Sequence, residues 1–286
     1  MYTATAPASA PEATLKVIEP PYYPIVYVRG YAMTASEREE VFQDGYYGFA
    51  ATSVEKRQAM APKGDPQVIK PGNQQVADIF EGQLIRFMKL GDYGYADSVN
   101  FGLDYSDNPA RSIWVSRFYD QDFIGGGIRS IEDHATELAT LILETIPDRL
   151  KEKGMTLGKD DQDYKVILIA HSMGGLVCRC LIQKLLPALG KDAEAIIHRL
   201  VTMGSPHGGI DLGSVPDFME RLVVQNLNPF DSNIFQENRM RQYLNLQQLK
   251  PGAAQKDRPK SDDYLYDVHS LGESNFPANR CLCIIG

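Results

Sequence analysis

The sequence contains no apolar run longer than Val166–Ala170, far short of the ~20 residues that a membrane-spanning helix needs. The N-terminus has neither the basic region nor the apolar stretch of a secretory signal. No block of Lys or Arg is long enough to follow a phosphate backbone, and 29 Lys+Arg against 37 Asp+Glu give a net charge of −8. We therefore expect no transmembrane segment, no nucleic-acid partner and a cytoplasmic location.

Cysteine is scarce, with four residues in two C-x-C pairs, Cys178/Cys180 and Cys281/Cys283. A four-thiolate zinc site is one interpretation, although structural zinc sites favour C-x₂₋₄-C spacing. Both pairs lie in apolar stretches, which favours the alternative that they are buried free thiols acting as small hydrophobic side chains. We therefore expect neither a metal nor another cofactor.

The rest of the composition is that of a globular chain. Hydrophobic residues make up 43% and charged residues 23% of the 286 residues, enough for a sizeable core. The Ala/Pro/Thr-rich residues 1–20 predict a disordered tail, and residues 21–286 predict one domain. Within it, residues 31–111 form a long insertion with one expected helix over Val76–Leu90. Residues 210–250 include a helical stretch that is either a lid or a plain packing helix.

Short apolar runs alternate with helical patterns along the chain. The runs that predict strands are Ile25–Val28, Ile113–Phe118, Val166–Ala170, Leu200–Met203 and Cys281–Ile285. Helices are expected after Ser130, which precedes the acidic turn Ile131–Asp133, and over Gly174–Leu186. Strands that alternate with helices pair in parallel, and apolar strands without alternation are covered on both sides. We therefore predict an α/β fold, a mostly parallel sheet with helices on both faces.

One segment of the sequence predicts a strand, a tight turn and a helix, with a serine at the turn. The segment VILIAHSMGG places Ser172 at the turn, which is the geometry of a nucleophile elbow. The serine of an elbow has a strained backbone, so the residues two before and two after it must be small, as Ala170 and Gly174 are. The helix directs free N–H groups at the serine, and the N–H of Met173 is the expected oxyanion donor. The competing interpretation is a tight glycine turn with a bystander serine.

Three blocks of sequence carry a resemblance to a known family. They are PIVYVRGY from Pro24, AHSMGGLV from Ala170 and LVTMGSPHGG from Leu200. Together they resemble an α/β-hydrolase of the lipase/esterase type, closest to the PGAP1-like lipases. The three blocks correspond in turn to the third strand of that family, its nucleophile elbow and its sixth strand. The resemblance implies that the N–H of Tyr31 is the second oxyanion donor, with Arg29 standing where the family usually has His.

The resemblance also implies that the catalytic residues follow one another along the chain as serine, acid and histidine. The acid then follows the seventh strand of the fold and the histidine follows the eighth. The seventh strand corresponds to Cys281–Ile285. We therefore expect this chain to be a truncated portion of a longer hydrolase, without the C-terminal strand and helices. The catalytic acid and histidine are then expected beyond Gly286.

Weaker alternatives for the base and the acid lie within the chain. They are His207, His269 and Asp211. His207 follows the strand Leu200–Met203, where a structural hydrogen bond is the competing interpretation. His171, beside the serine, is expected to pack rather than react, and His134 and His198 are expected at the surface.

These observations predict a serine hydrolase that cleaves carboxylic esters through an acyl-enzyme on Ser172. The resemblance and the aromatic-rich insertion favour lipid acyl esters, so the expected partner is a small-molecule or lipid ester, with transient membrane contact. Two alternatives remain open at this point. One is a non-catalytic hydrolase fold used as an interaction module, and the other is an acyltransferase with an alcohol acceptor.

Overall fold

The computed structural model describes residues 22–30, 83, 86–87, 94–95, 108–118, 129–157, 164–209, 232–246 and 276–284. The predicted tail, most of the insertion and residues 210–231 lie outside the described residues. Of the helix expected over Val76–Leu90, Gln83, Arg86 and Phe87 are described, and all three are helical. No helix in these described ranges is long and apolar enough to cross a membrane.

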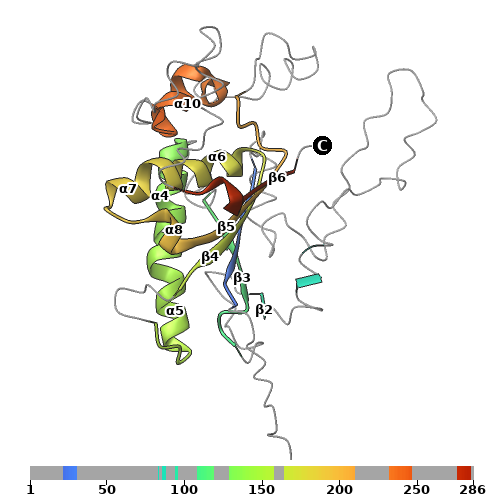
Figure 1. Ribbon diagram of the computed structural model, residues 1–286, viewed down its shortest axis with the longest axis vertical. Coiled ribbons are helices and arrows are strands. Elements are labelled where there is room, and N and C mark those ends of the chain that lie inside the picture. The colour runs from blue at the N-terminus through green and yellow to red at the C-terminus, as the bar shows by residue number, and fades with distance from the viewer. Residues whose placement is uncertain are drawn as a thin grey trace, which may run out of the picture.

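The described strands form one parallel sheet (Figure 1). They are β1 (Ile25–Val28), β2 (Gly94–Tyr95), β3 (Ser112–Ser116), β4 (Val166–His171), β5 (Ile197–Met203) and β6 (Cys281–Ile284). Their order across the sheet is β2-β3-β1-β4-β5-β6, and each neighbouring pair is parallel. The predicted α/β class is therefore confirmed, and β4, which leads to Ser172, lies inside the sheet between β1 and β5.

Burial follows the position of each strand in the sheet. Every residue of β1 and β3 is buried, as expected for apolar strands covered on both sides. Strand β6 is the last of the described strands across the sheet, and its residues range from half-buried to exposed. Leu282 and Ile284 are 56% and 48% exposed.

The described helices follow the sheet in the expected alternation. They are α4 (Ile131–Thr140), α5 (Ile146–Glu152), α6 (Met173–Cys180), α7 (Leu186–Ala188), α8 (Ala193–Ile196) and α10 (Glu237–Tyr243). The segments Leu141–Thr145 and Leu181–Leu185 are π-helical, and each joins two α-helices. Ser130 and Asp133 form a reciprocal capping box at the start of α4, as predicted from their order in the sequence.

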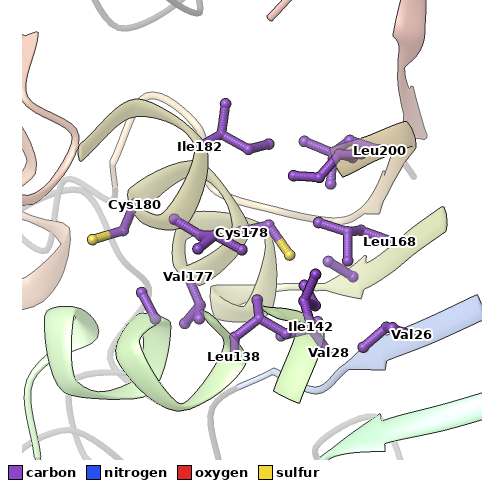
Figure 2. Close-up of a cluster of buried hydrophobic side chains, with 14 of the residues drawn as sticks. Val26, Val28, Leu138, Ile142, Leu168, Val177, Cys178, Cys180, Ile182 and Leu200 are labelled. Atoms are coloured by element: carbon purple, nitrogen blue, oxygen red, sulfur yellow. The ribbon is translucent and has the colours of Figure 1, made fainter. Parts of the chain in front are cut away.

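Helices α4 to α8 lie on one side of the sheet (Figure 1). Helix α6 packs between α4 and the sheet. In Figure 2, Cys178 of α6 points toward Leu168 of β4, while Leu138 and Ile142 lie on the side of α6 where Val177 is found. These side chains belong to one buried cluster, which fixes α6, and with it the turn at Ser172, against the strands.

A described residue of the insertion, Gln83, contacts the face of the sheet opposite α6. Side chains of successive strand residues point to opposite faces, and Thr202 faces Gly175 of α6, so Met203 points away from α6. There the side-chain amide of Gln83 donates to Met203 Sδ at 3.3 Å, and Phe87 packs against the core. Gln83 of the insertion therefore lies beside the carboxyl end of β5.

The described part of the predicted lid, residues 232–246, is packed against the core. Met240, Tyr243 and Leu244 are fully buried, and the Tyr243 hydroxyl donates to the carbonyl oxygen of Ile234 at 2.7 Å. Asn245 Nδ2 donates to the carbonyl oxygen of Gln183 at 3.2 Å. These contacts are those of the described part alone, and the choice between a lid and a packing helix for residues 210–250 stays a prediction.

Two histidines differ from expectation. His134 was expected at the surface, but it is 2% exposed and lies against the ring of Phe118, with a centroid distance of 4.4 Å. Burial lowers the pKa of His134 to about 3. His198 was expected before a strand, but β5 begins at Ile197 and includes it, and its half-buried ring stacks on Tyr23.

Candidate active site

Ser172 occupies the turn from β4 into α6 with φ 51° and ψ −127°. A non-glycine residue with positive φ in this region is strained, since its Cβ crowds the backbone. The local sequence provides what this conformation needs, because Ala170 is small and Gly174 and Gly175 have no side chains. The backbone N–H of Ser172 donates to the carbonyl oxygen of Met203 at 2.9 Å, which ties the turn to β5.

The glycines around Ser172 are places where main chains come together. A Cβ on Gly174 would meet the carbonyl oxygen of Val28 and would lie 2.5 Å from that of Arg29. A Cβ on Gly30 would lie 2.8 Å from the Cβ of Ser172. The end of β1 therefore lies directly against the serine and the first turn of α6.

This contact brings the end of β1 and the N-terminus of α6 to one end of the sheet. Met173 is the first residue of α6, where backbone N–H groups have no partner within the helix. Tyr31 lies outside the described residues, but it follows Gly30, which packs on Ser172. Arg29, which stands where the resembling family usually has His, is 7% exposed.

His207, on the loop after β5, is hydrogen-bonded to a side chain of that strand. His207 Nε2 lies 2.9 Å from Thr202 Oγ1 and 3.8 Å from Cys283 Sγ. Thr202 and Cys283 are directly opposite each other on β5 and β6. This is the structural hydrogen bond that was the competing interpretation of His207, extended by a thiol.

The other candidate residues are placed as follows. His171 ends β4 and is half-buried, with Nδ1 3.0 Å from the Cβ that Gly30 would carry. His269 and Asp211 lie outside the described residues.

Two site features were missed by sequence reasoning. Gln83 comes from the insertion, and no local pattern indicates its contact with Met203. Arg179 is an arginine 1% exposed on α6 that donates from Nε to Gln183 Oε1 at 3.1 Å and from Nη1 to the carbonyl oxygen of His207 at 3.3 Å. Its position seven residues after Ser172, on the otherwise apolar helix, was the available signal.

The two cysteine pairs differ from each other. Cys178 and Cys180 are buried, and burial raises the pKa of both thiols, that of Cys180 to about 12. Cys281 is half-buried, with a pKa raised by burial to about 11, and Cys283 is exposed. The expectation of buried thiols is therefore right for the α6 pair, whereas Cys281 and Cys283 lie on the outermost of the described strands and are half-buried and exposed. Within the described residues, no three His, Cys, Asp or Glu side chains are grouped to hold a metal ion.

A parallel sheet whose inner strand turns through a strained serine into a buried helix defines an α/β-hydrolase fold. The chain belongs to the palmitoyl protein thioesterase family, whose model matches residues 106–272, more than half of the chain. The match includes the turn at Ser172. These findings support the α/β-hydrolase part of the predicted resemblance and give no support to its finer PGAP1-like part.

The other comparisons add little. Among solved structures, the crystal structure of the Tle4–Tli4 complex is similar at 26% identity over 36% of this chain, with a TM-score of 0.26. A score that low carries no argument about the fold. The match spans 18% of the length of that chain. No curated protein matches this sequence.

Proposed function

We propose that the chain is a serine hydrolase that cleaves lipid acyl thioesters and esters, with Ser172 as nucleophile. The observation that carries this proposal is the backbone of Ser172, φ 51° and ψ −127°, at a strand-to-helix turn. Such a conformation costs about 1–3 kcal/mol and is characteristic of functional sites. The acyl substrate is supported by the family, which is described as palmitoyl protein thioesterases.

In the proposed reaction, Ser172 Oγ attacks the carbonyl carbon and its proton passes to a base. Negative charge develops on the carbonyl oxygen, where the N–H groups of Met173 and Tyr31 are the proposed donors. Each such donor is worth about 2.7–4 kcal/mol of transition-state stabilisation. The thiol or alcohol leaves with a proton, the acyl group stays on Ser172, and water then releases the fatty acid.

We place the base and the acid among residues outside the described ranges. His207 argues for this placement, because its Nε2 faces Thr202 and Cys283. Within the chain, His269 and Asp211 are alternatives to this placement, as is His207. His269→Gln and Asp211→Asn test them directly, since loss of a true base or acid abolishes turnover while the protein stays folded.

The nucleophile is tested with a fluorophosphonate probe on the longest natural form of the protein. We expect one label, on Ser172, and none in Ser172→Ala. Ser205→Ala is the matched control, because Ser205 lies against the same first turn of α6, and it should label like the wild type. A wild type without label at Ser172, or a label that persists in Ser172→Ala, overturns the proposal.

The substrate is tested separately. Hydrolysis of a palmitoyl thioester should exceed that of an acetyl thioester of the same thiol. An equal or reversed preference removes the lipid part of the proposal and leaves the serine hydrolase. Product analysis with an added alcohol shows whether water is the acceptor, since an alkyl ester product would identify an acyltransferase.

A further inference from the structure

We propose that Arg179 is a positioning residue for Ser172, because it fastens the loop that follows β5 to α6. This loop is residues 204–209, and it starts directly after Met203. The inference rests on the proposed function, since it concerns how readily Ser172 reacts. Its starting observation is a guanidinium that is 1% exposed and donates from Nη1 to the carbonyl oxygen of His207 at 3.3 Å.

The start of the loop is tied to the serine. The carbonyl oxygen of Met203 accepts the backbone N–H of Ser172 at 2.9 Å. The next residue, Gly204, has φ 56°, a left-handed conformation suited to glycine, and the chain bends there. A shift at the start of the loop is therefore passed directly to the turn at Ser172.

The loop then runs along one face of α6. Gly175 and Arg179 are four residues apart in the helix, so they share a face. Ser205 lies against Gly175, with its Cβ 2.7 Å from the Cβ that alanine would have there. One turn further on, Arg179 binds the carbonyl oxygen of His207. The loop is thus attached to both turns of α6 that follow Ser172.

The second hydrogen bond of Arg179 fixes the direction of its guanidinium. Nε donates to Gln183 Oε1 at 3.1 Å, and Gln183 is itself 2% exposed. The backbone carbonyl oxygen of Gln183 accepts from Asn245 Nδ2 at 3.2 Å, so this segment is held in turn. A planar guanidinium carries its N–H donors at fixed angles, so the bond to Gln183 aims another donor at His207. A lysine, with one nitrogen on a flexible stem, cannot hold both acceptors in this way.

The loop contacts should affect how fast Ser172 reacts. The serine keeps φ 51° although this conformation is strained, and the hydrogen bond to Met203 helps to hold it. A displacement of about 1 Å at a reacting group can lower the rate by about 10²-fold. We therefore expect the loss of Arg179 to slow the reaction of Ser172 in molecules that are still folded.

The test separates the rate of reaction from the amount of folded protein. The longest natural form is labelled with a fluorophosphonate probe, and each variant is followed to completion. The final extent of labelling counts the competent molecules, and the rate constant reports how Ser172 is positioned in them. We expect Arg179→Met to lower the rate constant by about tenfold or more, and Arg179→Lys to restore only part of the loss. Hydrogen exchange of the loop peptide should be faster in Arg179→Met.

Two control variants address a general loss of stability. Leu150→Ala removes a fully buried side chain from α5 and should destabilise the protein without changing the rate constant. Asn245→Ala removes the hydrogen bond to the carbonyl oxygen of Gln183 and leaves both bonds of Arg179 in place. Its rate constant should also stay at the wild-type value.

Labelling of the wild type distinguishes a failure of the proposed function from a failure of this inference. A wild type without label at Ser172 overturns the proposed function, and the positioning role of Arg179 falls with it. A labelled wild type overturns the positioning role alone if folded Arg179→Met has an unchanged rate constant or unchanged exchange of the loop. The same holds if Leu150→Ala or Asn245→Ala slows the labelling as much. If Arg179→Met does not fold, Arg179→Lys takes its place, and a wild-type rate constant in that variant overturns the role.

Discussion

Ser172 donates its backbone N–H to the carbonyl oxygen of Met203 at 2.9 Å, and Met203 Sδ accepts from the amide of Gln83. Three segments distant in sequence therefore meet at Met203: the turn after β4, the end of β5 and Gln83 of the insertion. The hydrogen bond to Met203 also helps to hold Ser172 in a conformation that an isolated turn would avoid.

The strain at Ser172 should be measurable as stability. Ser172→Gly removes the Cβ that crowds the backbone, while Ser172→Ala keeps it. We expect the glycine variant to be more stable than the alanine variant by about 1 kcal/mol in urea denaturation, after the entropic cost of glycine is subtracted. At Ser116, in an ordinary strand conformation, the same comparison should have the opposite sign. Equal stabilities at position 172 would contradict a strained serine.

Gly174 and Gly175, which follow Ser172, should differ in how much their substitution by alanine destabilises the protein. Gly174→Ala drives a Cβ into the main-chain oxygens of β1, which cannot rotate away, so we expect a loss of about 3 kcal/mol. Gly175→Ala meets the side chain of Ser205, whose Cβ would be 2.7 Å away. Ser205→Gly should restore most of the stability of Gly175→Ala and none of that of Gly174→Ala, as a double-mutant cycle measures. Equal rescue of both variants would show that the contacts are assigned wrongly.

The free energy of unfolding should decrease as the pH is lowered, because His134 is buried in its neutral form. Its pKa is about 3 in the folded protein, lowered first by burial and next by Arg129, with Asp133 acting in the opposite direction. The unfolded chain binds this proton near pH 6.5 and the folded chain does not, so stability is complete above 6.5 and is lost as pH falls toward 3. The loss is about 1.4 kcal/mol per pH unit.

His134→Leu should remove this slope between pH 6 and about pH 4, whatever its effect at neutral pH. Asp133 does not act in that window, because its pKa is lowered from 3.8 by the hydrogen bond to Ser130, so its contribution is lost only below about 3.8. Urea denaturation at several pH values checks both statements. An unchanged slope in the variant would assign the effect to another group.

Arg179 should matter for stability through its two acceptors. Arg179→Met leaves Gln183 Oε1 and the carbonyl oxygen of His207 without their charged donor, and Gln183 is 2% exposed. We expect a loss of about 2–3 kcal/mol in urea denaturation, the cost of unpaired buried polar groups. Arg239→Met, which removes a partly exposed arginine from its ion pair with Glu132, is the control and should cost less than about 1 kcal/mol. A similar small loss at both positions would mean that Arg179 is dispensable.

Much of the fold could be predicted because the signals are local. The apolar runs located β1, β4 and β6 to within a residue or two, and the order Ser130 to Asp133 gave the capping box of α4. His134 was mistaken for a surface residue, although it adjoins the buried face of its own helix. Short elements such as β2 and α8 carry too few residues to give a periodic pattern.

The sequence by itself determined the turn at Ser172. A strained strand-to-helix turn requires a small residue before the serine and glycines after it, and all of these lie within a few positions of Ser172. Only the tertiary structure decided which polar groups meet. His207 lies beside Thr202 and Cys283 because β5 and β6 pair in one register, and Gln83 meets Met203 although 120 positions separate them in the sequence. Strand register and side-chain direction are set by packing across the whole sheet, so no stretch of residues contains them.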